Sequence, residues 1–160
     1  LWHFDAVHGR VLDLYAGSGA VGIEGLSRGA DEAAFVEWNA VSAKTIRQNL
    51  IKLDLADQGH VHRQRVEDVL ARPALLGYQG PYDLISVTPP YAEVDFAVLL
   101  EQIAQSSLVG PGTVVVLEHP RDTELPAQCG PLEQLRERRY GRTALSIYEV
   151  PVEDDEDDAP

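Results

Sequence analysis

Two short segments, one rich in glycine and one in proline, contain the residues that could do chemistry. The first, Gly17–Gly22, reads Gly-Ser-Gly-Ala-Val-Gly, has the spacing G-x-G-x-x-G and follows the β-prone run Val11–Tyr15. Glycines let the backbone approach a ligand, and a helix after such a turn presents unpaired N–H groups. The turn alone fits NAD as well as a methionine-derived adenosine cofactor, and a tight turn without a ligand is the alternative.

Three acidic residues stand where they could contact such a cofactor. Asp13 lies in the strand before the turn, and Glu37 ends the next predicted strand, where a carboxylate can accept hydrogen bonds from ribose hydroxyls. Asp68 follows the third predicted strand and could accept from an adenine amino group, although aspartate at a helix start is also a common N-cap. The further candidates for cofactor binding are Tyr15, Ala16, Gly17, Ser18, Gly19 and Trp38.

The proline-rich segment, Thr88-Pro89-Pro90-Tyr91, ends the fourth predicted strand. Two prolines fix the backbone and remove two N–H donors, so nearby carbonyls lack partners of their own. Hydrogen bonds accepted by the Thr88 side chain and the Pro89 carbonyl would draw an exocyclic amine nitrogen toward tetrahedral geometry and aim it at a sulfonium methyl group. Tyr91 would stack on a base lifted out of its helix. We take these four residues as catalytic candidates, and a simple turn is the alternative.

The elements that must position these segments alternate along the chain. Apolar patterning predicts strands over residues 11–15, 33–37, 60–65, 82–87 and 113–118, and helices over 20–28, 42–53, 66–76 and 94–104. Two more strands, 132–140 and 143–150, form a hairpin. Strands joined through helices run parallel, so we predict an α/β fold with a parallel sheet, helices on both faces and a C-terminal antiparallel hairpin. The candidate residues all fall at the carboxyl ends of the strands, where ligands bind.

Composition and charge restrict the class of protein. A length of 160 residues predicts one domain over 1–150, and the acidic block after it predicts a disordered tail over 151–160. The single cysteine excludes an intramolecular disulfide, no apolar run reaches the roughly 18 residues of a membrane span, and the histidines lack metal-ligand spacing. We therefore expect a monomer that binds neither membrane nor metal.

The net charge of −13 argues against nonspecific nucleic-acid binding, because phosphate recognition depends on lysine and arginine. Residues 153–158 supply six of these negative charges, which leaves −7 for the rest of the chain. One basic cluster, Arg136, Arg138, Arg139 and Arg142, lies beside Tyr140 in the predicted hairpin. It could contact phosphate, or it could be a hairpin with exposed arginines.

With these residues identified, the chain resembles the RsmD-type family of ribosomal RNA guanine-N2 methyltransferases. The resemblance runs from about residue 9 to residue 150, and the segments that carry it are Val11–Gly22, Leu26–Ala30, Val36-Glu37, Asn49-Leu50 and Thr88–Tyr91. It implies the class I methyltransferase fold, S-adenosyl-L-methionine as cofactor and a guanine of small-subunit ribosomal RNA, or of its assembly particle, as acceptor. It also implies cofactor contacts at Gly17, Gly19, Glu37 and Asp68.

Two features depart from the family pattern. Thr88 stands where the family usually has Asp or Asn, and a basic N-terminal segment that helps to hold RNA is expected to be missing. The variant Ser86–Tyr91 is similar to the plant and algal branch, which implies a chloroplast address. The alternatives are a noncatalytic module of the same fold in ribosome assembly and an NAD-dependent oxidoreductase.

Overall fold

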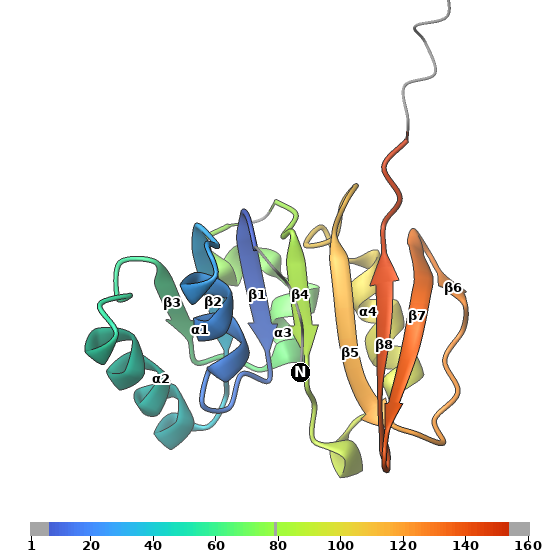
Figure 1. Cartoon of the computed structure of the whole chain (residues 1–160), viewed down its shortest axis with the longest axis horizontal. Helices are drawn as coiled ribbons and strands as arrows, with labels where there is room; N and C mark the ends of the chain where they lie inside the picture. The colour runs from blue at the N-terminus through green and yellow to red at the C-terminus, as the bar shows by residue number, and fades with distance from the viewer. Residues whose placement is uncertain (1–6, 79, 154–160) are drawn as a thin grey trace, which may run out of the picture.

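Eight strands in the order β3-β2-β1-β4-β5-β8-β7-β6 form one sheet in the computed structural model, which describes residues 7–78 and 80–153 (Figure 1). The parallel strands are β1 (Arg10–Leu14), β2 (Glu32–Val36), β3 (Gly59–His62), β4 (Leu84–Val87) and β5 (Val114–Pro120). The strands β6 (Gln128–Cys129), β7 (Leu132–Tyr140) and β8 (Thr143–Glu149) pair antiparallel, and β8 joins them to β5.

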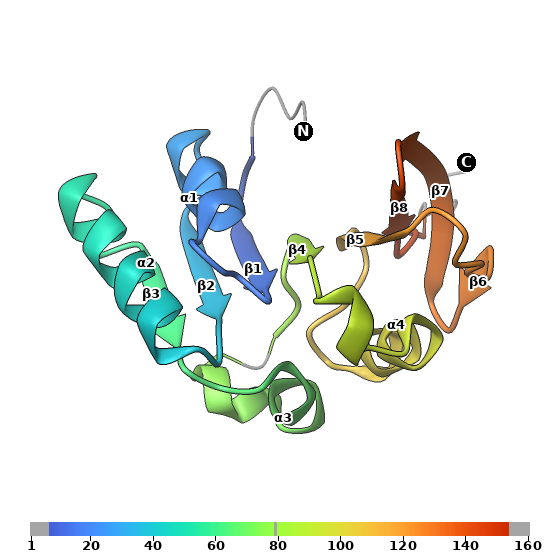
Figure 2. The ribbon, with the colours of Figure 1, turned by 90° about the horizontal axis from the view of Figure 1, so that it is seen from below.

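Four α-helices connect the parallel strands and cover both faces of that part of the sheet. They are α1 (Ala20–Ser27), α2 (Ala40–Lys52), α3 (Val66–Ala71) and α4 (Phe96–Gln105), with the 3₁₀ turns η1 (Pro73–Leu76) and η2 (Tyr91–Glu93). Figure 2 shows α1 and α2 on one side of the sheet and α3 and α4 on the other. Among the described residues, no helix lies over β5, β8 and β7 on the α1 side (Figure 1).

The core consists of two apolar clusters, one on each face of the sheet. Phe35 of β2 and Ile46 of α2 are fully buried in the cluster beneath α1 and α2. Leu14 of β1, Val87 of β4 and Leu100 of α4 are fully buried in the larger cluster on the opposite face. Burying one such side chain contributes roughly 1.5–3 kcal/mol, so the strands that carry the candidate residues are held from both sides.

Polar side chains cap the starts of α2 and α4, whereas α1 and α3 start without a side-chain cap. Asn39 accepts a hydrogen bond from the N–H of Ser42 at the start of α2, at 3.0 Å, and Asp95 accepts from the N–H of Val98 at the start of α4, at 3.2 Å. Such caps satisfy N–H groups that have no partner in the first helical turn. Both helices leave the carboxyl edge of the sheet, so their first turns border the candidate site.

The predicted α/β fold is confirmed, including the five alternating strands and the hairpin. The predicted helix over 66–76 is wrong in its continuity, because Pro73 ends α3 and begins a separate 3₁₀ turn. The third strand ends at His62 rather than at residue 65, and the two-residue β6 was not predicted. The predicted acidic tail lies outside the described residues from 154 onward.

Candidate functional site

A cavity of about 700 Å³ opens at the carboxyl edge of the parallel strands. Its walls come from the ends of β1, β2 and β4 and from the first turns of α2, α3 and α4. Six of the predicted site residues line it, namely Tyr15, Glu37, Trp38, Thr88, Pro89 and Pro90. The structure therefore brings the proline-rich segment and the end of β2 to one cavity, although about 50 residues separate them in the chain.

The glycine turn, residues 16–19, follows Tyr15 of the cavity wall in a backbone conformation that favours glycine, but none of its four residues lines the cavity. Gly17 has a φ of 59° and Gly19 a φ of 80°, and the N–H of Gly19 donates to the carbonyl of Ala16 at 2.8 Å. A Cβ atom on Gly17 would meet nothing within 4 Å, so open space lies beside the turn. Tyr15 also has a positive φ, 58°, which is uncommon for a residue with a side chain. Ser18 is exposed at the tip of the turn.

Glu37 connects the glycine turn to the start of α2. Its Oε1 accepts a hydrogen bond from the N–H of Gly17 and its Oε2 accepts one from the N–H of Asn39, each at 2.8 Å. A carboxylate offers about four acceptor positions, so each oxygen can accept one more hydrogen bond. Glu37 therefore fixes the shape of the turn and keeps acceptor capacity toward the cavity that it lines.

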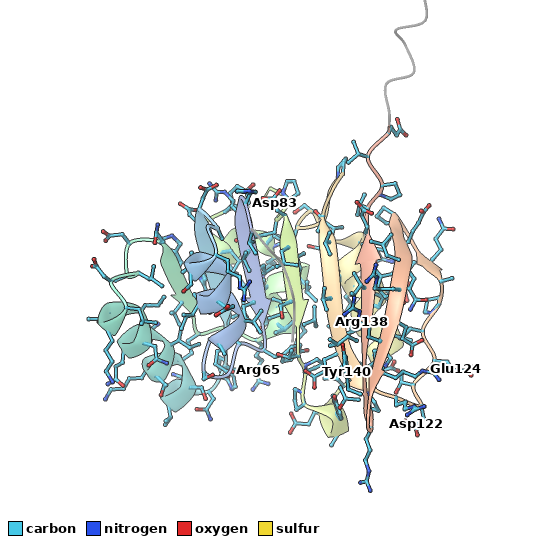
Figure 3. All side chains as sticks on the ribbon, in the orientation of Figure 1. Arg65, Asp83, Asp122, Glu124, Arg138 and Tyr140 are labelled. Carbon is cyan, nitrogen blue, oxygen red and sulfur yellow. The ribbon has the colours of Figure 1, made fainter. Side chains whose placement is uncertain are left out.

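Trp38 presents a half-exposed ring to the cavity, with 49% of the residue accessible to solvent. The guanidinium groups of Arg65 and Arg63 lie 4.6 and 5.2 Å from its ring centroid, which is within range of cation–π attraction. The Nε–H of Arg63 also donates to the Trp38 carbonyl at 3.1 Å. Figure 3 shows Arg65 at the lower edge of the sheet, where β1 ends. The two arginines therefore support the ring beside the cavity.

Asp13 is fully buried in β1, and its Oδ2 accepts a hydrogen bond from the N–H of Gly22 in α1 at 3.1 Å. Its Oδ1 has no hydrogen-bond partner among the described residues, and neither has the buried hydroxyl of Ser86, which stands opposite Asp13 in β4. Burial raises the pKa of Asp13 to about 7, the Gly22 hydrogen bond opposes this rise, and the charge of Glu37 adds to it. Asp13 therefore titrates near neutral pH.

Thr88 joins the end of β4 to the glycine turn. Its hydroxyl donates to the carbonyl of Tyr15 at 3.2 Å, and its N–H donates to the carbonyl of Leu14 at 3.4 Å. The hydroxyl hydrogen is thus committed, while the oxygen lone pairs remain able to accept. Burial raises the pKa of the Tyr15 phenol to about 12, so this neighbour stays neutral.

Tyr91 is not brought to the same cavity as the rest of the proline-rich segment. Its hydroxyl donates to Oε1 of Glu118 at 2.8 Å and lies 3.2 Å from the hydroxyl of Thr143, while its ring meets Phe96 edge to face at 5.9 Å. Tyr91 instead lines a second cavity next to β5 and the β7–β8 hairpin. Pro90 and Tyr91 therefore face different sides of one short segment.

Asp68 does not line the first cavity either. It occupies the first turn of α3, is half-buried, and donates its N–H to the carbonyl of Arg65 at 3.1 Å. The cavity is lined there by Gln64, Arg65 and Glu67, which the sequence interpretation did not single out. Because β3 ends three residues earlier than predicted, these residues take the position at the strand end that was assigned to Asp68.

No group of three or more metal-binding side chains occurs among residues 7–78 and 80–153. His119 is instead buried between the Oγ of Ser146, at 2.7 Å, and the carbonyl of Pro120, at 2.8 Å. Within the same described ranges, every helix is too short or too polar to cross a bilayer.

Residues 1–149 match a family model described as Conserved hypothetical protein 95. The chain belongs to this family. It is 37% identical over 148 residues to the Bacillus subtilis protein named "Putative rRNA methyltransferase YlbH", a match that covers 91% of this chain and 77% of that protein. It is 27% identical over 150 residues to Ribosomal RNA small subunit methyltransferase D of Haemophilus influenzae, which covers 92% and 76% of the two chains.

The fold agrees with these matches. A solved structure of a conserved hypothetical protein from Streptococcus pyogenes superimposes with a TM-score of 0.80 at 30% identity, over 89% of this chain and 86% of that one. Solved methyltransferase structures share the same arrangement of strands and helices. The predicted class I methyltransferase fold and the predicted RsmD-type family are therefore confirmed.

Proposed function

We propose that this protein transfers a methyl group from S-adenosyl-L-methionine to the exocyclic N2 of a guanine in small-subunit ribosomal RNA. The observation that carries the proposal is that Glu37 and Trp38 line the same cavity as Thr88, Pro89 and Pro90. The matched relatives are named as ribosomal RNA methyltransferases, which supports the class of reaction. The choice of guanine N2 follows the RsmD-type resemblance.

The residues around the cavity fit S-adenosyl-L-methionine, which supplies an electrophilic methyl group on a sulfonium. Glu37 accepts hydrogen bonds from the ribose hydroxyls with its remaining lone pairs. Trp38 stacks on the adenine through its exposed ring face. Gly17 leaves open space for close approach, and the fully buried Asp13 holds the N–H of Gly22 beneath the turn. Asp68 is assigned no contact beyond its part in shaping the first turn of α3.

The acceptor amine is held by oxygen atoms of the proline-rich segment. The Pro89 carbonyl and the Thr88 hydroxyl oxygen accept hydrogen bonds from the two amine N–H groups, which leaves the nitrogen lone pair free for attack. Pro89 and Pro90 have no N–H groups that could compete for these acceptors. Thr88 replaces a carboxylate or amide oxygen with a hydroxyl oxygen, which is a weaker acceptor. We therefore expect slower methyl transfer than with Asp or Asn at this position.

The test is calorimetric titration of the purified chain with S-adenosylhomocysteine and, in parallel, with NAD. Transfer of tritiated methyl groups to undermethylated small-subunit RNA is then measured. Binding of S-adenosylhomocysteine with transfer would support the full proposal. Binding without transfer would favour a noncatalytic module, for which the commitment of the Thr88 hydroxyl to Tyr15 is the specific observation. A folded sample that bound only NAD would favour the alternative function of an NAD-dependent oxidoreductase.

The finer expectations on location and assembly remain predictions. The relatives reported above come from bacteria, so they give no support to the chloroplast address that the Ser86–Tyr91 variant suggested. Ribosomal RNA, alone or in a small-subunit assembly particle, is the proposed partner. The monomeric state is to be checked by light scattering on the same sample.

A further inference from the structure

A second cavity, of about 1040 Å³, lies on the far side of the proline-rich segment from the first. Tyr91 lines it, whereas its chain neighbour Pro90 lines the first cavity. The remaining walls come from the end of β5, the loop 121–125, the strands β7 and β8 and the turn between these two strands. These segments meet at the same edge of the sheet as the carboxyl end of β4, so the two cavities are neighbours across one turn.

We propose that this second cavity binds a nucleotide of the RNA substrate, with Arg121 and Arg142 on its phosphate and the ring of Tyr91 against its base. The proposal rests on the function proposed above and extends it to the place where the RNA chain lies. Nothing in the family match assigns a role to these residues.

Hydrogen bonds connect several residues of the cavity wall to one another. A carbonyl can only accept, so Nδ1 of His119 donates to Pro120 at 2.8 Å, and Nε2 lies 2.7 Å from the Ser146 hydroxyl on the other side of the ring. Gln134 donates to the Ser146 hydroxyl oxygen at 3.3 Å and completes the chain of hydrogen bonds. A connected hydrogen-bond network of this kind favours one arrangement of the side chains and offers a defined surface to a ligand.

Tyr91 is held equally firmly. Glu118 and Thr143 fix its hydroxyl, and Phe96 supports its ring edge to face. Tyr91 still exposes 38% of its surface, so one side of the ring is available for contact. An aromatic ring of fixed orientation is the usual stacking surface for an unpaired base, and such stacking contributes about 1–3 kcal/mol per base.

The charged side chains of the cavity suit a nucleotide better than a simple anion. Arg139 pairs with Glu137 at 3.4 Å and Arg121 reaches the carbonyl of Gly141 at 3.4 Å, whereas the side chain of Arg142 has no hydrogen bond or ion pair within the described part of the chain. The guanidinium groups of Arg121 and Arg142 match phosphate oxygens, since both side chains are exposed and lack a carboxylate partner there.

Three carboxylates line the same cavity: Glu137, which pairs with Arg139, and Asp122 and Glu124, which lie in the loop 121–125 with Arg121. A carboxylate can only accept, and a base offers N–H donors, whereas a free phosphate would be repelled. A cavity that presents both cations and carboxylates therefore favours a whole nucleotide over an isolated phosphate.

The test measures how RNA affinity depends on salt. A fluorescent, unmethylated fragment of small-subunit RNA is titrated with the full chain at several salt concentrations, with S-adenosylhomocysteine present. In the double variant Arg121→Ala/Arg142→Ala, the slope of log affinity against log salt should fall by about 0.7, because the two arginines share one phosphate and each neutralised single-strand phosphate contributes about 0.7. Affinity at 0.1 M salt should fall at least tenfold.

The matched control is the double variant Lys52→Ala/Arg72→Ala, which removes the same charge from the ends of α2 and α3 at the opposite edge of the sheet. It should leave the salt slope unchanged, because charges beyond a Debye length of about 10 Å at 0.1 M are screened. All four substituted residues are exposed, so both variants should fold, and S-adenosylhomocysteine should bind them as it binds the parent chain.

An unchanged slope in Arg121→Ala/Arg142→Ala, or an equal fall in the control variant, would overturn the assignment of the second cavity. Failure of the parent chain to bind the RNA fragment would overturn it as well. Failure to bind S-adenosylhomocysteine would instead overturn the proposed function. An RNA affinity that still depended on the two arginines in that case would support the cavity as an RNA site alone.

Discussion

Replacing Asp13 by asparagine should flatten the pH dependence of stability. Asp13 is fully buried, and burial raises its pKa from the ordinary 3.8 to about 7. The folded protein therefore binds this proton more tightly than the unfolded chain does. The contribution of Asp13 to stability is fully present below pH 4 and is lost as the pH rises toward 7, where the carboxylate must be kept ionised without water.

The size of the effect follows from the two pKa values. A difference of about 3 pH units at about 1.4 kcal/mol each gives roughly 4 kcal/mol, of which about 2.6 kcal/mol is lost between pH 5 and pH 8. Asparagine keeps an oxygen that can accept from the N–H of Gly22 but does not titrate. The difference in free energy of unfolding between the Asp13→Asn variant and the parent chain should therefore shift in favour of the variant by about 2–3 kcal/mol from pH 5 to pH 8.

The assay is urea unfolding followed by circular dichroism at pH 5, 6, 7 and 8 for the parent chain and the Asp13→Asn variant. All other titrating groups are shared, so their contributions cancel in the difference between the two curves. Parallel curves over the whole range would refute the reasoning, because they would mean that Asp13 does not change its protonation on folding in this range.

Three further predictions follow from single contacts. Glu37→Ala should weaken S-adenosylhomocysteine binding at least tenfold, or about 1.4 kcal/mol, in a calorimetric titration, and unchanged affinity would remove Glu37 from the cofactor site. Gly22→Ala should destabilise the protein by about 1–3 kcal/mol in thermal unfolding, because its Cβ would overlap the ring of Phe35, and an unaltered midpoint would contradict that packing. Thr88→Asn should raise the rate of methyl transfer, since an amide can donate to the Tyr15 carbonyl and still accept through its oxygen. A lower rate would show that the threonine hydroxyl is required.

The fold could be predicted because the parallel strands are buried on both faces. In β1, β2 and β4, consecutive residues point into the two apolar clusters, so the sequence reads as short apolar runs. β3 is an edge strand of four residues without one fully buried side chain, and its end was placed three residues too late for that reason. β6 has only two residues, which is too short for any periodic pattern.

The candidate site could be predicted in part. The spacing identified Glu37, but its hydrogen bonds to Gly17 and Asn39 arise from the approach of two strand ends in space. Tyr91 follows Pro90 directly, which suggested that both face one cavity. The structure separates them because Glu118 and Thr143, 27 and 52 residues further along the chain, take the Tyr91 hydroxyl. The residues next to Tyr91 in the sequence give no indication of these two partners, so its position could not be predicted.

The position of β8 affects how the protein is made. β8 lies between β5 and β7 in the sheet, although it follows both in the chain. During synthesis, the edge of β5 therefore stays open until residues 143–149 have left the ribosome, and an open edge can pair with other chains. Thr143, the first residue of β8, also holds Tyr91. A nascent chain can thus form the glycine turn long before the residues that bind the Tyr91 hydroxyl have been synthesised. Interrupted synthesis would release a protein whose second cavity has not formed.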